Sequence, residues 1–79
     1  KLYIGQHTAE VLNCDVRKVK ENIEAIQSAV KFAEQTLDYV TRDLLQEILE
    51  KEEEYLDWTT TQIDLIESVG IENYIQSQI

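Results

Sequence analysis

The chain has 79 residues, 16 of them acidic and 7 basic, with a formal net charge of −9 at pH 7 and a single cysteine, Cys14. The negative charge argues against a nucleic-acid duplex or an anionic membrane as partner, and no apolar run approaches the roughly 20 residues that span a bilayer. One cysteine excludes an internal disulfide and indicates a reducing, cytoplasmic location, so a chain too short to bury a large core is expected to be stabilised by association with other chains.

A first helix is predicted from about residue 8 to residue 36. Proline is absent and the two glycines, Gly5 and Gly70, lie near the ends, so no strong helix breaker stands between them. Thr8 is the predicted N-cap, with Glu10 in the first turn to complement the helix dipole. Apolar positions recur in alternating steps of four and three, the spacing of a long bundle helix. We call this row the first seam; it comprises Leu12, Val16, Val19, Ile23, Ile26, Val30, Ala33 and Leu37.

A second helix is predicted from about residue 39 to residue 68. The same alternating steps define a second seam of Leu45, Leu49, Glu52, Leu56, Thr59, Ile63 and Ile66. The break between the two seams is short and offers Thr36, Asp38 and Thr41 as possible caps. A short connection makes the two helices antiparallel neighbours.

The tail is predicted to form a short helix of about residues 71–77. Gly70 has the place of a C-terminal cap, with an apolar residue directly behind it. Tyr39, Trp58 and Tyr74 are interpreted as packing or interface residues rather than as redox relays. The whole chain is therefore predicted to be all-α, with two long helices in an antiparallel hairpin and a short C-terminal helix.

Glu52 is the one carboxylate that falls on a seam position, with Leu49 one turn before it and Leu56 one turn after. A buried carboxylate is costly unless it is paired, protonated or bound to a metal. One reading is that Glu52 reaches the edge of the bundle or pairs with a lysine. The other is a metal ligand inside a four-helix bundle, where Glu-x-x-His motifs point inward from facing helices.

Three stretches carry a resemblance to the bacterioferritin family. "RDLLQEILEKEEEYLDW" and "IDLIESVGIENYIQSQI" resemble its last long helix and tail, and "KLYIGQHTAEVLNCD" resembles the approach to its third helix. The resemblance covers essentially the whole chain but only the second half of a subunit of that family. It implies one half of a ferritin-like four-helix bundle, assembly into a hollow iron-storage cage, a di-iron ferroxidase site and haem bound between paired subunits.

The resemblance also assigns metal-ligand positions, and only one of the three keeps its ligand. Glu52 stands where the family has a bridging glutamate. Tyr55 stands where histidine is expected, and a phenol with a pKa near 10 replaces imidazole poorly at ferrous iron. Val19 stands where the third helix should supply a glutamate, and valine cannot bind a metal. The family's axial haem ligand is a methionine of the second helix, and these 79 residues include neither that helix nor any methionine.

Three functions remain open from the sequence. The first is a subunit or half-subunit of a bacterioferritin-like iron-storage assembly with an incomplete ferroxidase site, working inside a mixed cage. The second is an active ferroxidase whose ligands come mainly from a partner chain. The third is a helical hairpin without iron that dimerises into a four-helix bundle as an interaction module. In each case the other two helices come from self-association or from a partner chain.

Overall fold

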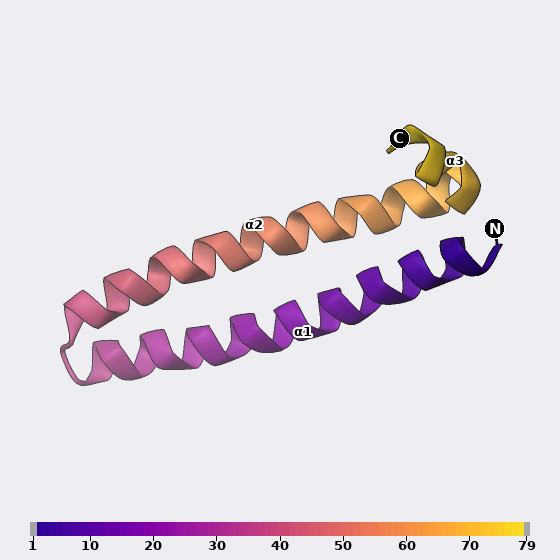
Figure 1. Ribbon diagram of the computed structural model, residues 1–79. Helices are drawn as coiled ribbons and strands as arrows, with labels where there is room; N and C mark the ends of the chain where they lie inside the picture. Colours follow the sequence, from indigo (N-terminus) through magenta and orange to yellow (C-terminus); the bar gives the residue numbers. More distant parts are fainter. Residues whose placement is uncertain (1, 79) are drawn as a thin grey trace.

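The computed structural model of the protein describes the backbone of residues 2–78 and the side chains of residues 7–70 and 73–78. Three helices follow one another, α1 (Leu2–Gln35), α2 (Tyr39–Val69) and α3 (Ile71–Ser77). The long helices α1 and α2 run side by side in opposite directions, with the turn at one end and α3 folded back at the other (Figure 1). The predicted all-α hairpin with a short third helix is thus confirmed. No helix within residues 2–78 combines the length and apolar character needed to cross a membrane.

The bounds of α2 and α3 agree with the predicted ranges to within one residue, but α1 starts earlier than predicted. It begins at Leu2, so Thr8 lies inside the helix and is not its N-cap. The physical reason is that Gly5 alone interrupts this stretch, and one glycine costs a helix interior only about 1 kcal/mol. Without a proline, nothing ends the helix before Thr8.

The chain leaves α1 through a Schellman motif. The Asp38 N–H donates to the Ala33 carbonyl at 2.8 Å, and the Leu37 N–H donates to the Glu34 carbonyl at 3.1 Å. Leu37 takes the left-handed position of this motif, with φ of 60°. The assignment of Leu37 to the first seam was wrong: its side chain is 70% exposed, because the reversal of the backbone turns it away from α2.

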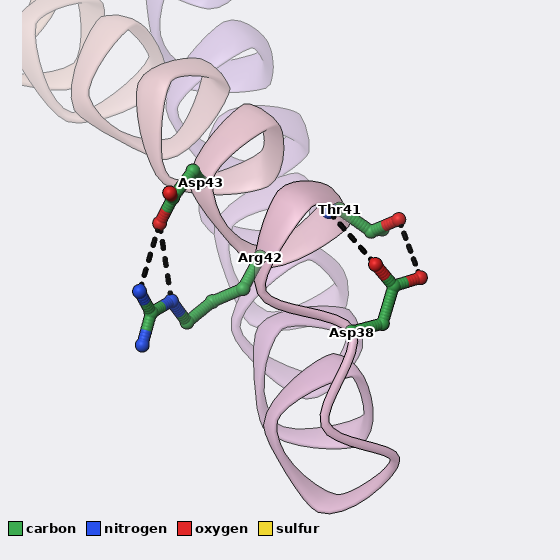
Figure 2. A network of polar contacts seen from close by, with 4 residues as sticks. All are labelled: Asp38, Thr41, Arg42 and Asp43. Atoms are coloured by element: carbon green, nitrogen blue, oxygen red, sulfur yellow. Dashed lines mark hydrogen bonds and ion pairs between the residues drawn. The ribbon is translucent and has the colours of Figure 1, made fainter.

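Asp38 is the N-cap of α2 (Figure 2). Its Oδ1 accepts a hydrogen bond from the Thr41 N–H at 3.1 Å, and its Oδ2 accepts one from the Thr41 hydroxyl at 2.7 Å. These two bonds, that of the hydroxyl first, lower the pKa of the Asp38 carboxyl. On the next residues, the Arg42 guanidinium pairs with the Asp43 carboxylate at 2.9 Å. The first turn of α2 is therefore fixed by local polar contacts.

The core is a single line of side chains between the two long helices. Both seams supply it, since the buried apolar side chains include Leu12, Val19, Val30, Ala33 and Leu49. Thr59 of the second seam is fully buried, and its hydroxyl donates to the Tyr55 carbonyl at 2.9 Å. The molecule measures 53 × 17 × 17 Å and has a radius of gyration of 16.8 Å. A compact chain of this length would have a radius of gyration of about 12 Å, so the hairpin is elongated and this line of side chains is not surrounded by further helices.

The helix α3 closes the open end of the hairpin. Tyr74 is buried, and its hydroxyl donates to Oε1 of the buried Gln62 side chain at 2.7 Å. This bond satisfies two polar groups that would otherwise be costly to bury. The prediction that Tyr74 packs is confirmed, whereas Tyr39 and Trp58 are exposed on α2.

Candidate metal centre

Glu52 lies near the middle of α2, half-buried in the second seam between Leu49 and Leu56. Across the hairpin, Tyr55 and Asp15 are joined by a hydrogen bond, which fixes the antiparallel register of the helices. About one turn nearer the connection, this register sets Val19 within about a helical turn of the level of Glu52. The three positions that the resemblance singled out therefore lie in one short section of the hairpin.

The Tyr55 hydroxyl is engaged in a hydrogen bond and is not free to act as a metal ligand in that section. The hydroxyl donates to Oδ2 of Asp15 at 3.2 Å, and this bond links α2 to α1. The ring is 44% exposed and stacks on the ring of Trp58, with 6.1 Å between centroids and 23° between planes. Tyr55 thus acts as a cross-helix contact at the edge of the hairpin.

Val19 is a core residue with 6% of its surface exposed. It brings a buried methyl pair close to the level of Glu52, where a metal site would need an oxygen or nitrogen donor. In the part of the chain with described side chains, Glu52 itself makes no hydrogen bond or ion pair. Across the same residues, no group of three or more His, Cys, Asp and Glu side chains is placed to hold a metal ion.

The residues present do not fit a di-iron centre. Carboxylate and imidazole donors suit ferrous iron, whereas this half offers one carboxylate, one phenol that is hydrogen-bonded to Asp15, and one valine. Glu52 alone could contribute a single ligand to a metal held mainly by other groups. The resemblance places the haem ligand on a helix outside these 79 residues, which themselves contain no methionine.

Two polar contacts in the hairpin were not found from the sequence. The bond between Tyr55 and Asp15 spans 40 positions, and the bond between Tyr74 and Gln62 spans 12. Each depends on the exact register of two helices, which the heptad pattern alone leaves undetermined within a turn or two. The seam did carry one usable signal, since it placed Thr59 inside, where it is fully buried.

Known proteins resemble this chain along nearly all of its length. The family profile described as ferritin-like domain matches residues 2–69. A bacterial ferritin of Synechocystis sp. is 39% identical over 77 residues, covering 96% of this chain and 49% of that protein. A bacterial ferritin of Neisseria meningitidis serogroup B is 36% identical over 80 aligned positions, with coverages of 100% and 52%. A bacterioferritin of Brucella melitensis is 33% identical over 75 residues, with coverages of 95% and 47%.

These matches confirm the resemblance seen in the sequence and set its extent. The chain spans about half the length of the curated relatives that it matches. A hairpin of two long helices with a short third helix is the part that this half contributes. The chain belongs to the ferritin-like domain family.

Proposed function

We propose that this chain supplies one half of a ferritin-like four-helix bundle in an iron-storage assembly of the bacterioferritin type. The observation that carries the proposal is the match to bacterial ferritins over the whole chain but only half of each relative. The open shape supports it, because a hairpin 53 Å long and 17 Å thick needs two further helices to close a bundle core. Those helices come from a second copy or from another polypeptide.

In this assembly the hairpin forms part of the protein shell and provides an acidic surface that attracts cations, rather than a complete site of iron oxidation. Helix α2 has only Arg42 and Lys51 as basic residues against nine acidic ones, which are Asp43, Glu47, Glu50, Glu52, Glu53, Glu54, Asp57, Asp64 and Glu67. A surface with such an excess of one sign concentrates ions of the opposite sign near it. Ferrous iron is the substrate, and the groups that oxidise it belong to other subunits of a mixed cage.

The proposal is tested by incubating the purified chain with ferrous iron under air and measuring both oxidation and particle size. We expect the chain alone to oxidise iron no faster than buffer, and a large assembly that oxidises iron to form when a full-length bacterioferritin subunit is co-assembled. Rapid oxidation by the chain alone would instead indicate an active site with ligands from a partner copy. That result would contradict the incomplete site proposed around Glu52.

A second candidate is an interaction module that dimerises into a four-helix bundle without iron. It is favoured by the ligand positions, since Val19 is a core residue and the Tyr55 hydroxyl is bonded to Asp15. Light scattering separates the two candidates. A small dimer that takes up no iron, even with a full-length subunit present, would support the module and exclude the storage role.

A further inference from the structure

A row of exposed apolar side chains follows α2 beside the second seam. We call it the outer row; it comprises Val40, Leu44, Ile48, Tyr55, Trp58, Leu65 and Val69. Lys51 and Gln62 complete its steps of three and four residues. Each member precedes a second-seam position by one residue or continues that spacing, so the row is turned about 100° from the face that packs on α1. Helix α3 reaches the row at one place, where Tyr74 bonds to the buried Gln62, and the Tyr55 hydroxyl reaches Asp15 of α1, but the apolar members themselves stay exposed.

A line of carboxylates borders the outer row on the side away from α1. We call it the acid row; it comprises Asp43, Glu47, Glu50, Glu54, Asp57 and Asp64, each one residue before an outer-row position and each exposed. Thr61 and Ser68 complete the line, so it contains no basic residue. Asp43 is already paired with Arg42, so whatever packs on the outer row has its far edge against five exposed carboxylates for which no ion pair is described.

The charges disfavour a second copy of this chain as the occupant. An antiparallel pair of α2 helices packed through their outer rows would place one acid row against the other, and like charges facing each other are destabilising. The other surface that a copy offers is α1, whose charges are mixed. It has four basic residues, Arg17, Lys18, Lys20 and Lys31, against five acidic ones, Glu10, Asp15, Glu21, Glu24 and Glu34.

We propose that the outer row docks an amphipathic helix whose apolar stripe is edged by lysine or arginine. From Val40 to Trp58, before the buried Gln62, the row extends about 27 Å at 1.5 Å per residue, which suits one partner helix. Lysine or arginine at that helix's edge would meet the acid row, while its apolar stripe would cover Ile48 and Trp58. The proposal rests on the proposed function in that such a helix closes the bundle, but iron plays no part in it.

The test uses two synthetic helical peptides with the same leucine stripe, edged with lysine in one and with glutamate in the other. Trp58 is the only tryptophan and is 53% exposed in the outer row, so its emission reports docking directly. We expect the lysine-edged peptide to shift this emission to the blue and to bind at least about tenfold more tightly than the glutamate-edged peptide at low salt. The difference should shrink in high salt, which screens exposed charges.

Two double variants with equal net charge separate this edge from a general attraction to an acidic protein. Glu47→Lys with Glu54→Lys reverses charge in the acid row and should exchange the peptide preference. Glu53→Lys with Glu67→Lys makes the same change about 160° around α2 from the outer row and should leave the preference as it was. Circular dichroism of both variants verifies that the helices are retained.

Several outcomes would overturn the proposal. These are equal binding of the two peptides, equal effects of the two double variants, or a blue-shifted Trp58 in the chain alone that returns to the red on dilution. The last would identify a second copy as the occupant. A failure of the iron-storage role would show in iron loading and would leave the peptide preference unchanged, so the two proposals can fail independently.

Discussion

Leu37 combines a left-handed backbone with a side chain that is 70% exposed. For a residue with a Cβ this conformation costs roughly 1–2 kcal/mol, and the exposed side chain recovers little of that by packing. The Schellman motif nevertheless needs a residue at this place, since the bonds from Leu37 and Asp38 end α1. The hydrogen bonds of the turn therefore hold Leu37 in an unfavourable backbone conformation.

Replacing this leucine with glycine should stabilise the protein. Leu37→Gly removes the steric cost of the left-handed conformation but adds conformational freedom to the unfolded chain. We expect a net gain of about 0.5–1 kcal/mol, measured by urea unfolding. The control is Leu44→Gly, another exposed leucine but inside α2, which should instead lose about 1 kcal/mol. A loss at both positions would show that Leu37 is not strained.

Asp38 ties the stability of α2 to pH. Its pKa is lowered from the ordinary 3.8, so the ionised form is the one that the folded state favours. The stabilising effect of the cap is therefore complete above the ordinary pKa and is lost as pH falls through the lowered one. Asp38→Ala should lower the melting temperature by about 5 °C at pH 7, and this difference should vanish in strong acid.

The neighbouring carboxylate is the control for this cap. Asp43 makes its described contacts with Arg42, whose Nε and Nη2 both donate to Oδ1, and ion pairs near the surface contribute little. Asp43→Ala should shift the melting temperature by less than about 2 °C at pH 7. Equal shifts for the two alanine variants would show that the Asp38 bonds to Thr41 do not hold α2.

At the scale of the helices, periodicity predicted most of the packing. Steps of four and three placed Leu12, Val19, Leu49 and Thr59 inside, and all are buried. The pattern failed at the end of α1, because the apolar spacing continues to Leu37 although the helix ends at Gln35. It also could not show which groups meet across the hairpin, since the bond from Tyr55 to Asp15 depends on register.

The assignment of the ligand positions remains a prediction that a double substitution can test. Val19→Glu with Tyr55→His should rebuild this half of a di-iron site around Glu52 when the other two helices are supplied. Without metal the variant should be several kcal/mol less stable, because it buries a carboxylate and an imidazole without partners. Ferrous iron or cobalt should recover that loss in proportion to occupancy, as seen in thermal melting. An equal gain by the unaltered chain would place the site elsewhere.

At the scale of the whole molecule, the hairpin has one covered and one uncovered apolar face. Leu49 lies in the line between the helices, while its neighbour Ile48 is 49% exposed in the outer row. The sequence predicted that other helices must cover such a hairpin, from its small size and long seams. The sequence did not separate the outer row from the second seam, because the two rows have the same spacing and are offset by one residue. Only the packing of α1 against the seam distinguishes them.

The pair of neighbours gives a direct test of the two faces. Leu49→Ala should cost about 2–4 kcal/mol of hairpin stability, measured by urea unfolding at a concentration where the chain is folded. Ile48→Ala should cost less than about 1 kcal/mol there, yet it should weaken binding of the lysine-edged peptide, as followed by Trp58 emission. If Ile48→Ala destabilised the hairpin as much as Leu49→Ala, the outer row would already be covered.

The tight turn at Leu37 and the bond between Tyr74 and Gln62 at the opposite end also determine how the hairpin opens. Contacts between α1 and α2 can form progressively from the turn outward, since each further contact closes only a slightly longer loop. Chains dominated by such local contacts fold fast. Fraying should begin at the far end, where α3 contacts both long helices and Tyr74 bonds to Gln62. Removing only that hydroxyl, with Tyr74→Phe, should let opening run inward as far as the bond between Tyr55 and Asp15. Amide exchange would then quicken in the last turns of α2 while the turns beside Asp38 kept their protection.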